Sequence, residues 1–259
     1  MRVAAGSQRS LGVRVGFVSE TGKRSANEDY VAVCLARDGV VARDIVAAVA
    51  DGVGGYNGGR EAAELAVRSF LDAYYSLPET LGIRRRAARA LEAVNGWIYS
   101  QGRVDSRLSG MSCAFSSMIL SRRLCHIIHI GDTRAYRLSE GRLERLTQDH
   151  IAGRGDFAHA LSRAIGFEEF ARFDYTTTGL RQHDRLLLCS DGVHGALADQ
   201  HQGGREGDGV GRDVVPAHLA EHGGRLAELG QRVEHAAGRE DAAVARGGGG
   251  GDHDEVDDA

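Results

Sequence analysis

Hydrophobic and polar residues follow two different periods along residues 11–199, and the change of period predicts the order of the elements. Alternation over residues 13–17 and 30–36 predicts two half-buried strands. Residues 45–50 are apolar throughout, which predicts a central strand that ends at Asp51. The amino-terminal part of the chain is therefore predicted to be β-structure.

From Arg60 the apolar residues recur with the period of a helix. One face of this helix carries Ala63, Ala66, Val67, Phe70, Leu71 and Tyr74. A second helix is predicted over residues 83–99, after a break at Pro78. Strands return in two predicted hairpins, residues 113–120 with 124–130 and residues 134–138 with 142–146. Strands, then helices, then strands predict an α+β domain with antiparallel sheets.

Two apolar runs each deliver an Asp-Gly pair at their end. Asp51-Gly52 follows residues 45–50, and Asp191-Gly192 follows the strand-like residues 186–189 and Ser190. An aspartate followed by glycine presents carboxylate and carbonyl oxygens, which suit Mg²⁺ or Mn²⁺ better than Zn²⁺. A single Asp-Gly pair after a strand is usually only a turn. Two pairs that converge could form one metal cluster.

Two further motifs accompany these pairs. Arg24 stands four residues before the carboxylates Glu28 and Asp29, and Gly131-Asp132 follows the apolar residues 124–130. With the motifs in this order, the chain resembles the metal-dependent PPM (type 2C) protein serine/threonine phosphatases, most of all their compact bacterial members. The resemblance covers about residues 11–199, and its matching segments are residues 24–29, 51–55, 110–112, 131–136, 147–150, 163–166 and 190–192.

The resemblance makes the predicted fold more definite. It implies two packed antiparallel β-sheets flanked by helices, an α-β-β-α sandwich, with the metal cluster at one edge. Residues 1–199 are then a phosphatase domain. The implied reaction is the dephosphorylation of phosphoserine or phosphothreonine in proteins by a hydroxide that bridges two metal ions.

The resemblance also implies a role for each of the main site residues. Asp51 bridges two Mg²⁺ or Mn²⁺ ions, the Gly52 carbonyl and Glu28 serve one ion, and Asp191 serves the other. Arg24 and the metals neutralise the phosphoryl oxygens. Arg24 and Asp51 are the catalytic residues in this interpretation.

Other acidic residues have secondary roles. Asp29 is expected to form hydrogen bonds with metal-bound water. Two roles stay open for Asp132, a third and weaker metal site or the cap of a turn. Asp149 and His150 are expected to hold the local turn. Asp241 is the candidate for the family's last metal ligand.

The segment from residue 200 to 259 has a different composition. It contains fourteen of the chain's 36 glycines and no Phe, Tyr, Trp, Ile, Met or Cys, which predicts disorder. The Asp-Asn pair and Val-rich final strand of the family are absent from it. The five glycines of residues 247–251 are what repeated valine codons give when read one base out of frame. A reading-frame shift near Asp199 is therefore an alternative to a natural disordered tail.

Net charge and composition argue against nucleic acid and membranes as partners. A net charge of -4 gives no basic field for nucleic acid, and no apolar run approaches the roughly 20 residues of a membrane span. We expect a cytoplasmic monomer whose four dispersed cysteines are buried, reduced thiols. The family resemblance implies that its substrate is a phosphorylated protein and that it opposes a bacterial Ser/Thr kinase.

The sequence leaves two alternatives open. The first is an inactive phosphatase-like module that binds a phosphoprotein through Arg24 without hydrolysing it. The second is a phosphatase-like regulator that acts on an antagonist of the anti-sigma type.

Overall fold

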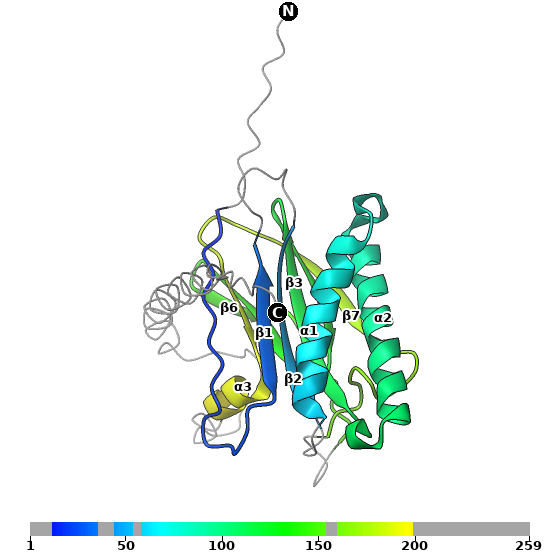
Figure 1. Ribbon diagram of the computed structural model, residues 1–259. Coiled ribbons are helices and arrows are strands. Elements are labelled where there is room, and N and C mark those ends of the chain that lie inside the picture. Colours follow the sequence, from blue (N-terminus) through cyan, green and yellow to red (C-terminus); the bar gives the residue numbers. More distant parts are fainter. Residues whose placement is uncertain (1–11, 36–43, 54–57, 154–159, 199–259) are drawn as a thin grey trace, which may run out of the picture. The chain divides into compact units, whose positions relative to one another are not determined.

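The computed structural model describes residues 12–35, 44–53, 58–153 and 160–198 (Figure 1). All of these except residues 14–18 belong to one compact unit, and this unit is described below. Within it the chain forms two antiparallel sheets and a layer of helices.

The larger sheet has five strands in the order β1-β2-β3-β4-β7. Every neighbouring pair is antiparallel. The strands are β1 (Asp29–Cys34), β2 (Ile45–Val53), β3 (Ser112–Ser121), β4 (Leu124–Ile130) and β7 (Asp174–Gly179).

The smaller sheet has three strands in the order β6-β5-β8. These are β5 (Arg134–Ser139), β6 (Arg142–Arg145) and β8 (Arg185–Cys189). The turn between β5 and β6 places Glu140 and Gly141 at positive φ angles of 51° and 77°. Two successive residues with positive φ match the twist of a tight hairpin.

Two long helices cover one face of the larger sheet, α1 (Gly59–Ser76) and α2 (Gly82–Val104) (Figure 1). Their apolar stripes pack on the sheet around Phe70, Leu91, Ile98 and Phe115 to form the main core. Two short 3₁₀ turns, η1 (Glu79–Leu81) and η2 (Ser106–Leu108), flank α2. A third helix, α3 (Asp191–Ala198), follows β8 directly.

A second core joins the two sheets. Because side chains alternate across a strand, β3 sends Phe115 and Ile119 to the helices and Met118 to the smaller sheet. Met118 and Ile127 pack there with Ala135. Burial on both faces explains why these strands are apolar over their whole length.

Most of the predicted elements are confirmed. The α+β class, the two antiparallel sheets, both long helices and both hairpins are as expected. The four cysteines are free thiols, and three are buried, while Cys34 is half-buried. No helix within the described ranges is both long and apolar enough to cross a membrane.

Three details differ from the sequence predictions. Residues 13–17 form no strand, because no ladder among the described residues includes them, and alternation without a pairing partner does not make a strand. β2 continues two residues beyond Asp51, to Val53, because Gly52 and Val53 still pair with β3. The edge strand β7 was not predicted, because its threonine-rich residues 174–179 are mostly exposed and lack an apolar face.

Candidate metal centre

Three strands bring aspartates to one end of the larger sheet. β2 and β4 run in the same direction, since each is antiparallel to β3. Asp51 therefore lies near the end of β2 at which β4 delivers Asp132. Asp29 begins β1 and is the register partner of Asp51. Antiparallel pairing thus sets these carboxylates together although they are distant in the sequence.

Asp191 joins the cluster from the smaller sheet. It lies two residues beyond the end of β8 and is the first residue of α3. Ser190, next to it, donates a hydrogen bond of 2.6 Å from Oγ to Oδ2 of Asp29. This bond ties the end of β8 to the start of β1.

Burial and like charge dominate the electrostatics of Asp51. The residue is only 8% exposed. Burial raises its pKa from 3.8 to about 9, helped by the charges of Asp29 and Asp191, a hydrogen bond with Asp191 and the charge of Asp132. No positive group is among these causes. A bound cation or a proton is what such a cluster of carboxylates requires.

Asp132 lies in the same negative environment. Burial raises its pKa from 3.8 to about 6, and the charges of Asp191 and Asp149 add to the shift. Its backbone carbonyl accepts a hydrogen bond of 2.9 Å from Nε2 of His194, on α3. The turn after β4 and the helix after β8 are therefore in direct contact.

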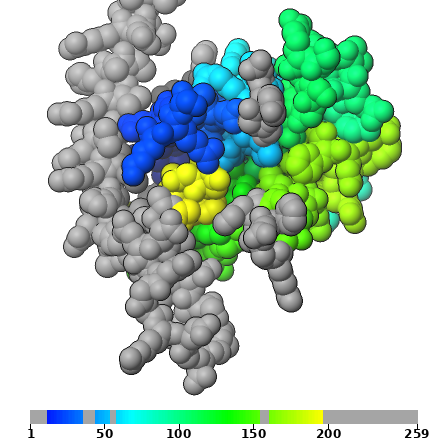
Figure 2. All heavy atoms as spheres, turned by 90° about the horizontal axis from the view of Figure 1, so that it is seen from below, coloured from blue at the N-terminus to red at the C-terminus, as the bar shows by residue number. Residues whose placement is uncertain are grey.

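Arg24 closes the cluster on the solvent side. Its Nη2 lies 3.7 Å from Oδ1 of Asp191, and the two side chains are 67% and 43% exposed. Figure 2 shows this face, with the yellow α3 beside blue residues of the range 19–35, from which Arg24 contacts Asp191 and Asp29 contacts Ser190. A guanidinium at the open edge of a carboxylate cluster is suited to meet an incoming anion.

Glu28 and Gly52 are joined through the backbone. The amide of Gly52 donates to the carbonyl oxygen of Glu28 at 3.2 Å. A Cβ at Gly52 would stand 2.3 Å from the carbonyl of Gly59, so only glycine fits at this close approach of β2 to α1. The Glu28 carboxylate lies against Gly59, within 3.2 Å of where a Cβ on that glycine would be. Glu28 thus flanks the first residue of α1.

The predicted ligand residues fall into three groups. Asp29, Asp51, Asp132 and Asp191 share one electrostatic environment. Glu28 and Gly52 lie together beside α1. Asp241 lies outside the described residues. In the part of the chain that the structure describes, no three His, Cys, Asp or Glu side chains are arranged closely enough to hold a metal ion.

Asp149 and His150 hold the chain locally, as predicted. Asp149 accepts hydrogen bonds from Arg134 and Arg145, the shorter ones being 2.7 Å and 2.6 Å. His150 bonds to the backbone of Gly131. Both contacts fix the segment that runs beside the Asp132 turn.

Two residues near the cluster were missed from the sequence. Ser190 stands directly before Asp191 but was given no role, since a serine beside an aspartate carries no signal of its own. His194 follows Asp191 by three residues, which is about one helical turn. A helix predicted to begin at Asp191 would therefore have placed the side chains of Asp191 and His194 on one face.

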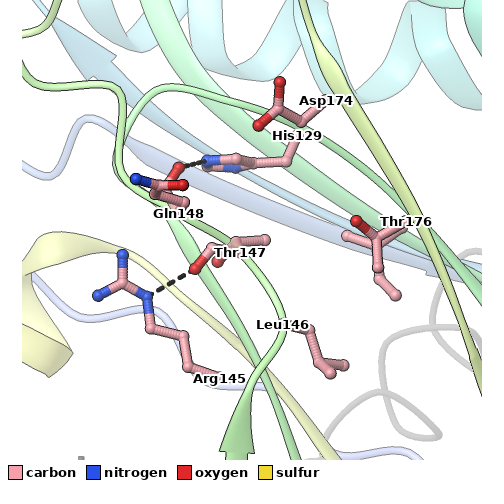
Figure 3. Close-up of a pocket in the computed structure, with 8 residues that line it drawn as sticks. His129, Arg145, Leu146, Thr147, Gln148, Asp174 and Thr176 are labelled. Atoms are coloured by element: carbon pink, nitrogen blue, oxygen red, sulfur yellow. Dashed lines mark hydrogen bonds between the residues drawn. The ribbon is translucent and has the colours of Figure 1, made fainter. Parts of the chain in front are cut away.

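A separate pocket of about 330 Å³ lies between the β6–Asp149 segment and the edge of the larger sheet (Figure 3). None of the predicted ligand residues lines it. Its wall consists of Ile127, His129, Arg145, Leu146, Thr147, Gln148, Asp174 and Thr176. The pocket is therefore distinct from the aspartate cluster.

Comparison with known proteins identifies the family. Residues 19–221 match the family described as protein phosphatase 2C. The serine/threonine phosphatase stp of Listeria monocytogenes serotype 4b is 30% identical over 198 residues, which cover 68% of this chain and 76% of that protein.

Solved structures resemble the fold. The Mycobacterium tuberculosis serine/threonine phosphatase PstP/Ppp is 25% identical, with a TM-score of 0.57 over 84% of this chain and 88% of that one. The serine/threonine phosphatase Stp1 of Staphylococcus aureus has a TM-score of 0.63 at 18% identity, over 86% of this chain and 93% of that one. At that identity the likeness concerns the fold alone.

Proposed function

Because the chain belongs to the protein phosphatase 2C family, we propose that its aspartate cluster is the metal centre of the enzyme. As a member of this family the protein is a protein serine/threonine phosphatase, a hydrolase that depends on divalent metal ions. The observation that carries the proposal is the buried Asp51, whose neighbours are other carboxylates.

The donor set fits hard divalent cations. Every candidate ligand offers oxygen, which favours Mg²⁺ or Mn²⁺ over Zn²⁺. Asp51 is the proposed bridge between two ions, with Asp191 on one of them. Glu28 and the Gly52 carbonyl are the proposed ligands of the other, which their shared position beside α1 supports.

Asp132, Asp29 and Asp241 complete the proposal. Asp132 is assigned to a third, weaker ion, since the contact of its carbonyl with His194 on α3 places it beside Asp191, the first residue of that helix. Asp29 is held by Ser190 and lies opposite Asp51, so it suits hydrogen bonding to water at the centre. Asp241 remains a proposed ligand from outside the described residues.

When bound, the ions would neutralise the phosphoryl oxygens and make the attacking water more acidic. The protein's own residues do the rest. The four aspartates fix the position of the centre, and Arg24 binds a phosphoryl oxygen at the open edge. Because Arg24 already lies near Asp191, the phosphate is held next to the carboxylates rather than at a separate subsite.

A phosphorylated protein is the proposed substrate. Arg24 and Asp191 are both well exposed, so a phosphorylated side chain on the surface of another protein can reach them. We assign the protein to the dephosphorylation of targets of a bacterial Ser/Thr kinase, and we expect a cytoplasmic monomer.

The test is hydrolysis by the full-length chain after removal of metals. A phosphothreonine peptide should be hydrolysed when Mn²⁺ or Mg²⁺ is restored, and not without them. Binding of the peptide without release of phosphate under all metal conditions would favour the inactive phosphoprotein-binding module. A full rate after exhaustive chelation would contradict the metal centre.

A further inference from the structure

The turn that carries Asp132 is held from behind by a buried histidine. The amide of Gly131 donates to Nδ1 of His150 at 3.1 Å, and the amide of His150 donates to the carbonyl oxygen of Gly131 at 2.7 Å. His150 is 7% exposed. One residue therefore satisfies both backbone polar groups of the residue that precedes Asp132.

The conformation of Gly131 leaves little freedom at this point. Its φ angle is 101°, and a Cβ there would stand 2.4 Å from Cβ of Ala114. Such a backbone is accessible to glycine, which loses more conformational freedom on ordering than any other residue. The two bonds from His150 hold the chain in this conformation.

The ring of His150 is itself oriented by a second partner. Its Nε2 lies 3.2 Å from Oδ2 of Asp174, whose Oδ1 is 3.4 Å from Nη1 of Arg163. Because Nδ1 accepts from Gly131, the hydrogen-bond network assigns the ring proton to Nε2, which donates to Asp174. Nη1 of Arg163 lies 3.4 Å from Nε2, and since both are then donors, Arg163 pairs with Asp174 rather than with the ring. A carboxylate behind a histidine fixes the tautomer and the direction of the opposite nitrogen.

The other two residues of the turn are held by different elements. Asp132 accepts through its carbonyl from His194. Thr133 is bonded to Ser116, at 2.8 Å between the two hydroxyls, and Ser116 in turn lies 2.8 Å from Nδ1 of His129. Figure 3 shows the far side of His129, where Nε2 meets the carbonyl of Gln148. All of these contacts involve groups other than the Asp132 carboxylate.

We propose that His150 is a positioning residue that aims the Asp132 carboxylate at the metal centre, an inference that rests on the proposed function. His150 acts through Gly131 alone and contacts neither the substrate nor the carboxylate. Loss of its Nδ1 acceptor would free the amide of Gly131 and let the turn rotate away from the other aspartates.

Two substitutions of similar size separate the two sides of the ring. In His150→Asn the side-chain oxygen reaches the position of Nδ1, so the acceptor for Gly131 is kept and the contact with Asp174 is lost. In His150→Gln the side-chain amide reaches the position of Nε2, so the contact with Asp174 is kept and the acceptor for Gly131 is lost. Both side chains are polar and fill much of the space of the imidazole ring, so we expect both variants to fold.

The first measurement is hydrogen exchange of the Gly131 amide in the metal-free, full-length chain. We expect exchange about tenfold faster in His150→Gln than in the unsubstituted protein, since a buried amide loses its partner. His150→Asn should stay within about threefold of the unsubstituted protein. Equal exchange rates of the Gly131 amide in the two variants would overturn the proposed role of His150.

The second measurement is Mn²⁺ binding by titration calorimetry, with each variant made alone and in an Asp132→Asn background. We expect His150→Gln to weaken the Mn²⁺ site that Asp132→Asn also weakens, by about tenfold, and to add nothing once Asp132 is replaced. His150→Asn, which keeps the acceptor for Gly131, should retain the Mn²⁺ affinity of the unsubstituted protein. Equal effects of His150→Gln in both backgrounds would show a general structural role and overturn the inference.

The control is His126→Gln, on the same strand as His129 and bonded to Tyr175 at 2.7 Å. It should change neither the Gly131 exchange nor Mn²⁺ binding. If Asp51→Asn leaves Mn²⁺ binding intact, the proposed function fails. If Asp51→Asn abolishes binding while the His150 and Asp132 effects add, only the positioning role fails.

Discussion

Each end of β2 carries an aspartate with little exposed surface, but the charged neighbours of the two aspartates have opposite signs. Asp44, directly before the strand, accepts from Tyr74 at 2.6 Å and lies 3.2 Å from the guanidinium of Arg86. The side chains of Asp44 and Arg86 are 12% and 6% exposed. Asp51, near the other end, faces three more aspartates.

This difference separates a structural site from a functional one. The Asp44 carboxylate has its counter-charge within the chain, and the Arg86 guanidinium also lies 4.1 Å from the centre of the Tyr74 ring. The buried Asp51 carboxylate has no positive group among the neighbours that shift its pKa, whereas Arg24 and Arg134 act on Asp191 and Asp132 at the edges of the cluster. Buried like charges at the end of a strand are costly to folding, so they point to a ligand.

The largest expected effect is that of Asp51→Asn on turnover. This change keeps the shape and removes the charge that the proposed bridge needs, so the rate should fall by at least about 100-fold. The measurement is steady-state hydrolysis of a phosphothreonine peptide with Mn²⁺. Asp44→Asn is the matched control and should keep its rate per folded molecule. A rate within about twofold for Asp51→Asn would remove the bridge assignment.

The pH dependence of stability should also distinguish the two ends. The pKa values of Asp51 and Asp132, about 9 and about 6, lie above the unfolded value of 3.8. Between the unfolded pKa of 3.8 and the folded pKa of Asp51, about 9, the folded state binds more protons than the unfolded state. The stability of the metal-free protein should therefore fall as pH rises from about 4 to about 9.

Thermal unfolding in a chelator across this range measures that slope. Asp51→Asn should flatten it, and Asp44→Asn should shift the whole curve without removing the slope. A metal-free protein that becomes more stable with rising pH would contradict the cluster electrostatics.

Breaking the Asp44–Arg86 pair should reduce stability instead of catalysis. Removal of one partner from a buried ion pair leaves an uncompensated charge, so Arg86→Met should cost about 3 kcal/mol in the free energy of unfolding. Denaturant unfolding measures this loss. Arg68→Met, which removes the exposed pair with Glu64, should cost at most about 0.5 kcal/mol. Equal losses would mean that burial does not set the strength of the pair.

Arg24→Ala should have the smallest effect of the site substitutions. Arg24 is exposed and meets the phosphate at the edge of the cluster, so its loss should raise KM by about tenfold and lower kcat by less. Lys23→Ala removes the neighbouring positive charge and serves as the control. A fall in kcat at unchanged KM would place Arg24 in the transition state rather than in substrate binding.

The sequence predicted the fold well because periodicity reports burial directly. The stripe of α1 and the doubly buried strands β2, β3 and β4 carry strong patterns. The strand predicted at residues 13–17 was wrong, because these residues alternate in polarity but pair with no strand among the described residues. The strand β7 was missed, because it pairs at the edge of the sheet but its exposed residues carry no apolar pattern.

The site was predicted less completely than the fold. The Asp-Gly pairs and Arg24 have local signals, and the structure brings Asp51, Asp132, Asp191 and Arg24 together. Ser190, His194 and the contact of His150 with Gly131 depend on tertiary contacts between segments that no spacing reveals. The Asp44–Arg86 pair was missed for the same reason, since its partners are 42 residues apart.

The most direct test of the central claim is the effect of Mn²⁺ on unfolding of the unsubstituted protein, Asp44→Asn and Asp51→Asn. A ligand that binds only the folded state at about 100 times its dissociation constant adds about 2.7 kcal/mol of stability. We predict that Mn²⁺ stabilises the unsubstituted protein and Asp44→Asn by equal amounts and leaves Asp51→Asn unchanged. An equal gain in all three proteins would contradict a metal centre at the Asp51 end of β2.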